Sequence, residues 1–164
     1  MRKQLTTAAI ATCLVLVAVR AQAGTVDVDY ENATFRINNE DVKLSNGKRA
    51  MPAAPGSATQ HVTRVFGKPV GGRLDSKPAA ALFLADEPGG SGIFRYVAVA
   101  FSDCSKTNAI FLGDRIMPRS IVFHGSSIVV TYLDRKPDEP MAVIPKVTKS
   151  MTLGFDSKTC QLAK

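Results

Sequence analysis

The sequence predicts an all-β protein, or a β-rich α+β protein, built as a single antiparallel sandwich or barrel-like domain. Three observations support this prediction. Short runs rich in β-branched residues alternate between apolar and polar side chains. Gly, Pro, Asn and Asp interrupt these runs at short intervals. No stretch after residue 23 has the apolar period of a helix longer than one or two turns.

The N-terminal residues 1–23 are predicted to be a secretory signal peptide. Arg2 and Lys3 give a positive start, and an apolar run follows at residues 8–19. Residues 21–23, Ala-Gln-Ala, supply the small-x-small pattern of a signal peptidase site. The apolar run of about 12 residues is shorter than the roughly 20 that a bilayer requires. An uncleaved anchor is the alternative interpretation of this segment.

Cleavage after Ala23 would leave residues 24–164 as a single exported domain, either periplasmic or secreted. The full chain has 21 Lys+Arg against 14 Asp+Glu, a net charge of +7. Loss of Arg2, Lys3 and Arg20 leaves 18 against 14, a net charge of +4. This charge suits solubility and a mild attraction to anionic envelope polymers. No nucleic-acid motif is present, so nucleic acid is not expected as a partner.

The cysteines predict one disulfide. Cys13 lies within the signal, and Cys104 and Cys160 remain in the exported domain. Two cysteines in an exported protein typically pair. Both lie in polar, turn-like segments, so the bridge is expected to join the C-terminal tail to a mid-chain loop. A redox-active thiol is disfavoured because there is no C-x-x-C motif.

The first part of the exported domain reads as short strands with tight connections. Residues 25–30 alternate apolar and polar side chains, and the Asn-Gly pair of residues 45–48 indicates a hairpin turn. The expected order is a strand at 25–30, a strand at 34–37, a turn at 38–39, a strand at 42–44, a turn at 45–48 and a loop at 51–56.

The middle of the chain contains the clearest hairpin. Residues 79–85 are apolar without a break, as in a buried strand, and residues 86–92 form the strongest turn signal. A short helix capped by Ser57 competes with the strand at 58–66. The expected order is a strand at 58–66, a polar loop at 68–78, a strand at 79–85, a turn at 86–92 and a strand at 93–101.

Four further strands complete the predicted domain. Residues 125–127, Gly-Ser-Ser, turn one pair of them. The last strand alternates apolar and polar residues and is expected to close the fold. These strands are placed at 108–112, 120–123, 128–133 and 146–155.

Two Asp-Arg dipeptides are the most informative polar features. Each follows a predicted strand and begins a loop that contains proline. Carboxylates there can cap turns, and an arginine can bind a carboxylate through two hydrogen bonds. One interpretation is an ion-pair network that fixes two loops, and the other is a polar patch for a ligand.

The segments 107–118 and 134–141 resemble a family of small exported bacterial proteins and lipoproteins. The shared motifs are Thr-Asn-Ala-x-x-Leu-Gly-Asp-Arg-Ile-x-Pro and Asp-Arg-Lys-Pro-x-Glu-Pro-Met. The resemblance extends over residues 56–155 and implies an exported domain, without implying a reaction. The candidate binding residues in these motifs are Asn108, Asp114, Arg115, Asp134, Arg135 and Glu139.

The predicted function is an exported, non-enzymatic binding or envelope-accessory domain. Its partner would be an envelope protein or an anionic envelope polymer. A carboxylate-dependent hydrolase that uses Asp134, Asp138, Glu139 and Arg115 is the alternative, and a purely structural envelope protein is a third hypothesis. No cofactor or metal is predicted, because the chain has only two His and few other ligands for zinc or calcium.

Overall fold

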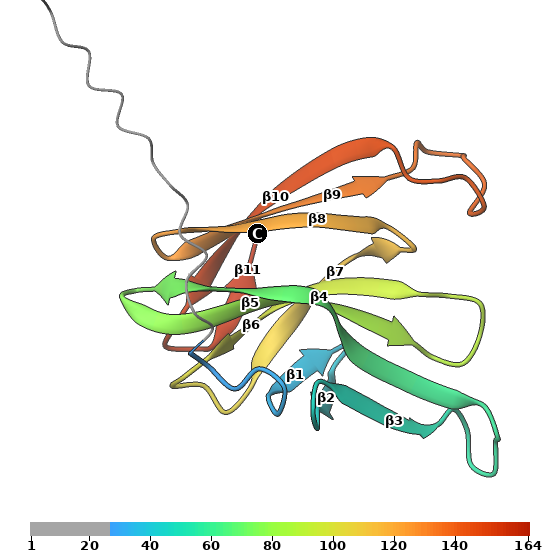
Figure 1. The fold of residues 1–164 in the computed structure, drawn as a ribbon, viewed down its shortest axis with the longest axis horizontal. Helices are drawn as coiled ribbons and strands as arrows, with labels where there is room; N and C mark the ends of the chain where they lie inside the picture. The colour runs from blue at the N-terminus through green and yellow to red at the C-terminus, as the bar shows by residue number, and fades with distance from the viewer. Residues whose placement is uncertain (1–26) are drawn as a thin grey trace, which may run out of the picture.

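The computed structural model describes residues 27–164, which fold into strands without a helix (Figure 1). The predicted signal peptide and its cleavage site lie outside the described residues. Within this range no helix is long and apolar enough to cross a membrane. The strands are β1 (Thr34–Ile37), β2 (Glu40–Lys43), β3 (Lys48–Pro52), β4 (Gln60–Leu74), β5 (Lys77–Glu87), β6 (Phe94–Phe101), β7 (Thr107–Asp114), β8 (Met117–His124), β9 (Ser127–Asp134), β10 (Val147–Asp156) and β11 (Gln161–Ala163).

The strands form two sheets, which confirms the predicted all-β class. The larger sheet has seven strands in the order β2-β1-β7-β6-β5-β4-β3, and the smaller has four in the order β11-β10-β9-β8. Neighbouring strands are antiparallel except β1 and β7, which pair in parallel at Phe35↔Thr107 and Arg36↔Asn108. In Figure 1 β8, β9 and most of β10 lie above β4–β6, and β1–β3 lie below them.

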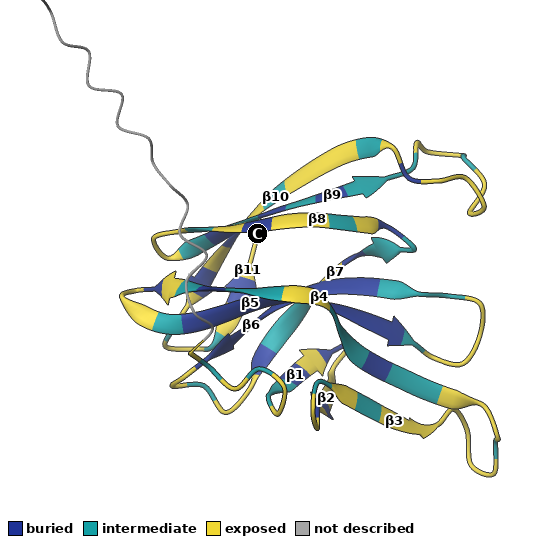
Figure 2. Cartoon of the chain, viewed as in Figure 1, coloured by how far each residue is buried: buried dark blue, intermediate teal, exposed yellow. Residues whose placement is uncertain are grey.

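Strands β5 and β6 form a middle layer that is buried on both faces (Figure 2). One face packs against the four-stranded sheet through Phe83 and Val97, and the other packs against β1 and β2 through Leu84 and Ala98. This double burial explains why the predicted strand at 79–85 is apolar at every position instead of alternating.

The seven-stranded sheet curls until its two edge strands approach each other. The Arg49 guanidinium of β3 donates to the Glu40 carboxylate of β2 at 2.7 Å. Ser45, which follows β2, forms an isolated bridge with Lys48 at the start of β3, around the predicted Asn-Gly turn. The sheet therefore has the barrel-like form that the sequence predicted.

Several predicted boundaries are wrong. Residues 27–30 are not a strand, and Thr25 and Val26 lie outside the described residues. The predicted loop at 51–56 begins as the end of β3. The strand at 58–66 is confirmed from Gln60 onward, and the competing helix is not formed.

The predicted polar loop at 68–78 is also wrong, because β4 continues through it to Leu74. The breakers Gly67 and Pro69 fall where the register between β4 and β5 shifts, so they form a bulge and do not end the strand. Asp75 and Ser76, both with positive φ, then make a two-residue turn into β5.

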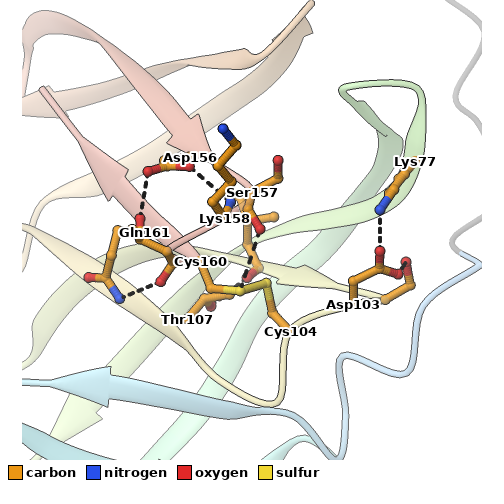
Figure 3. Close-up of a disulfide and its surroundings, with 12 residues drawn as sticks. Lys77, Asp103, Cys104, Thr107, Asp156, Ser157, Lys158, Cys160 and Gln161 are labelled. Atoms are coloured by element: carbon orange, nitrogen blue, oxygen red, sulfur yellow. Dashed lines mark hydrogen bonds and ion pairs between the residues drawn. A yellow bond between two sulfur atoms is a disulfide. The ribbon is translucent and has the colours of Figure 1, made fainter.

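The predicted disulfide is present and ties the two sheets together (Figure 3). Cys104 follows β6 in the larger sheet, and Cys160 lies in the turn between β10 and β11. Their Cα atoms are 6.0 Å apart. The bridge also holds β11, a strand that the sequence did not predict, beside the start of β7.

Candidate functional site

The two Asp-Arg loops meet at one end of the molecule. Met117 of β8 pairs with Leu133 of β9, so the β7–β8 turn lies beside the end of β9. Together with the loop that joins β9 to β10, they enclose a cleft of about 460 Å³. Its lining residues are Gly113, Asp114, Asp134, Arg135, Lys136, Pro137, Glu139, Met141, Val147 and Lys149.

Arg135 connects the two loops. Its Nε donates to the carbonyl oxygen of Val143 at 2.6 Å. Its Nη1 lies 3.4 Å from the carbonyl oxygens of both Asp114 and Arg115. The guanidinium therefore fixes the β9–β10 loop against the β7–β8 turn. Within residues 27–164 its Nη2 has no hydrogen-bond partner in the protein.

Asp114 and Arg115 hold the β7–β8 turn against the β5–β6 loop. The Asp114 carboxylate accepts a 2.8 Å hydrogen bond from the backbone N–H of Ile93. The backbone N–H of Arg115 donates to the Ile93 carbonyl at 2.8 Å, and its guanidinium donates to the Ser91 carbonyl. Asp114 lines the cleft, whereas the Arg115 side chain is directed to the neighbouring loop.

Asp134, which lines the cleft, is held in its ionised form. Partial burial opposes its ionisation, but hydrogen bonds from Lys149 and from the Arg135 backbone N–H outweigh that effect and lower its pKa. The Lys149 Nζ lies 2.6 Å from the carboxylate, and this hydrogen bond raises the pKa of Lys149. Asp134 and Lys149 thus form a stable ion pair.

Glu139 caps the loop between β9 and β10. Its carboxylate accepts a 2.8 Å hydrogen bond from the backbone N–H of Lys136. Asp138 beside it is exposed, has a φ of 70° and does not line the cleft. The Glu139 carboxylate therefore uses only the backbone N–H of Lys136 and leaves the Lys136 side chain exposed.

Asn108 lies apart from this cleft, at the opposite end of β7 from Asp114. Its amide donates to the Leu162 carbonyl at 2.9 Å and accepts from the Leu162 N–H at 2.6 Å. The Asn108 amide thus forms the pair of hydrogen bonds that a neighbouring strand's backbone would form, and it connects β7 to β11. The structure thus brings together Asp114, Asp134, Arg135 and Glu139, but not Asn108.

Sequence reasoning did not select Lys136 or Lys149 as site residues. Lys136 follows Arg135 in the same Pro-containing loop, and this position in the sequence could have identified it as a site residue. Lys149 is found only from strand register, because Val147 pairs with Asp134 and Lys149 follows two residues later on the same face.

The electrostatics of Asp134 bear on the predicted hydrolase alternative. A hydrolase with two carboxyl groups needs one with a raised pKa to act as the acid, whereas Asp134 has a lowered one. In the described range, no three His, Cys, Asp or Glu side chains form a group that could hold a metal ion. No family model, curated protein or solved structure matches this chain, so the resemblance to exported proteins and lipoproteins stays a prediction.

Proposed function

We propose that the protein is an exported, non-enzymatic binding domain whose cleft receives an anionic group of an envelope component. The observation that carries this proposal is the convergence of the two Asp-Arg loops on one cleft, fixed by Arg135. A preorganised cleft loses little conformational entropy when a ligand binds.

The preference for an anion follows from which charges are already satisfied. The carboxylates of Asp114, Asp134 and Glu139 each accept a hydrogen bond from the protein. Arg135 retains Nη2, and within residues 27–164 the Lys136 ammonium has no hydrogen-bond partner. A ligand therefore meets free cationic hydrogen-bond donors on Arg135 and Lys136, and the net charge of +4 expected after cleavage also favours an anionic partner.

The disulfide supports an exported location, because such bonds persist in oxidising compartments. Cell fractionation followed by thiol alkylation tests this part of the proposal. We expect the protein in the periplasmic or extracellular fraction with Cys104 and Cys160 resistant to alkylation until a reductant is added. Recovery in the cytoplasm with both thiols reactive would contradict export.

The binding function is tested with residues 24–164 immobilised and exposed to an envelope extract separated into glycan and protein fractions. We expect retention of an anionic component that weakens as salt is raised. Lys136→Glu should reduce retention, because it reverses one charge and leaves the backbone N–H that Glu139 accepts. Lys43→Glu is the matched control, since Lys43 is exposed on β2 on the opposite side of the middle layer.

Two results would contradict the proposal in different ways. If the Lys136→Glu and Lys43→Glu variants retain the anionic component equally, the cleft is not the binding site. An absence of any retained component from both fractions would count against the binding function itself and would favour a purely structural role.

A further inference from the structure

A second pocket lies on the inner face of the curled sheet and shares no lining residue with the Asp-Arg cleft. Strand β1 is short and pairs with only Thr107 and Asn108 of β7. Further along β7, Phe111 is therefore left uncovered and is 49% exposed. Large apolar side chains that are exposed beside other apolar groups often mark binding surfaces.

Three aromatic rings meet at this position. Phe111 pairs across the strands with Tyr96 of β6, and their ring centroids are 5.3 Å apart with an angle of 55° between the planes. Phe94 lies 6.2 Å from Phe111 at 63°. These rings and Asn38 line a pocket of about 270 Å³. The inclined rings offer both faces and edges, so another ring can pack against them in the favoured offset or edge-to-face geometry.

Asn38 supplies the polar group of the pocket. It lies in the tight β1–β2 turn with a φ of 49°, a conformation that asparagine tolerates well. Its Nδ2 donates to the Tyr96 hydroxyl at 2.9 Å, which fixes the orientation of the amide. Within residues 27–164 no group donates to the amide oxygen, which can accept a hydrogen bond from a ligand.

The neighbouring carboxylate is already engaged and does not make this a site for a cation. Asp86 pairs across the strands with Phe94. It accepts a 2.7 Å hydrogen bond from the Thr63 hydroxyl and lies 2.7 Å from Nε2 of His61. A neutral ring therefore suits the pocket better than an amine.

We propose that this pocket binds a single aromatic ring that carries an N–H or O–H donor, as an indole or a phenol does. The pocket is smaller than the roughly 300–1,000 Å³ of most ligand sites, which limits the occupant to one ring system. The ring can belong to a free small molecule or to a tryptophan or tyrosine side chain of another protein. This site is independent of the proposed anion-binding cleft.

The chain itself contains no tryptophan, so the fluorescence of an added indole reports binding without background. We would titrate N-acetyltryptophanamide against residues 24–164 and follow its anisotropy, with its 1-methylindole analogue as the ligand that lacks the donor. Phe111→Ala should weaken binding about three- to tenfold, the usual effect of losing one aromatic contact. Asn38→Gly, which keeps the left-handed turn, should weaken binding of the parent ligand to the level of the analogue.

Val122→Ala is the matched control, because Val122 is 48% exposed on β8 of the other sheet. If Phe111→Ala does not fold, Phe111→Leu retains apolar volume and removes only the ring. If a tryptophan-containing peptide binds more tightly than N-acetyltryptophanamide, the natural ligand is a side chain of another protein. If N-acetyltryptophanamide binds more tightly, the natural ligand is a small molecule. No saturable binding to the wild type, or equal affinity in the wild type and the Phe111 variant, would overturn the proposal.

Discussion

The substitution Gly72→Ala tests how the two sheets pack. Gly72 lies in the second half of β4, directly beneath the ring of Phe123 from β8. A Cβ atom placed on Gly72 would lie 2.5 Å from Cγ of that ring. Carbon atoms pack favourably at about 3.5–4.0 Å, so the ring must retreat by about 1 Å.

This displacement sets the expected cost. Phe123 packs against the core between the sheets, where its retreat would disturb neighbouring side chains. Overpacking of this kind typically costs about 1–3 kcal/mol. For a domain of this size the same loss lowers the melting temperature by about 4 °C for each kcal/mol.

Urea unfolding followed by circular dichroism measures this loss, and a second variant isolates its cause. In a Phe123→Ala background the overlap is absent, so Gly72→Ala should cost nothing or stabilise slightly. Gly90→Ala is the control, because a Cβ there meets no atom within 4 Å. If Gly72→Ala is equally costly in both backgrounds, the loss comes from the backbone and the proposed sheet contact is wrong.

Three further predictions follow from the contacts at the sheet ends. Reduction of the Cys104–Cys160 bridge, whose cysteines are 56 residues apart, should lower the free energy of unfolding by about 4 kcal/mol, measured by urea unfolding with and without reductant; an unchanged midpoint would contradict this. Asn108→Ala should cost about 1–3 kcal/mol and speed hydrogen exchange in β11, because the backbone partners of its amide are left unpaired; unaltered exchange there would contradict the pairing. The pKa of Asp134 is lowered, so the ionised carboxylate adds to the free energy of unfolding above about pH 4, and this stabilisation is lost as pH falls through the folded pKa. The pKa of Lys149 is raised, so its stabilisation is lost as pH rises above about 10 and through the folded pKa. Asp134→Asn should flatten both limbs of the stability–pH curve relative to an Asp138→Asn control, and two unchanged limbs would refute the pairing.

The middle of the fold could be predicted because one physical pattern governs it. Burial on two faces requires an unbroken apolar run, and the Gly-rich residues 88–92 form the predicted turn, although Asp86 and Glu87 at its predicted start belong to β5. The second half of β4 was missed because Gly67 and Pro69 indicate a break, whereas they form a bulge. The Asp75-Ser76 turn lacks the Asn-Gly signal that identifies such turns.

The candidate site was predictable in part. Both Asp-Arg pairs occur at strand ends, and antiparallel neighbours bring such ends together. The partners of these groups depend on tertiary structure: Lys149 reaches Asp134 through strand register, and Asn108 was assigned to the site although its amide binds the Leu162 backbone. Sequence spacing carries no information about either contact.

The uninterrupted apolar segment of β5 has a consequence for the protein before it folds. Residues 79–85 are wholly apolar and contain neither a charge nor a proline, features that favour cross-β assembly of an exposed segment. Lys77 and Pro78 precede the segment, and Asp86 and Glu87 follow it, where charges and proline oppose such assembly. An unfolded chain would therefore depend on these flanking residues, or on a holding chaperone, to stay soluble until the segment is enclosed.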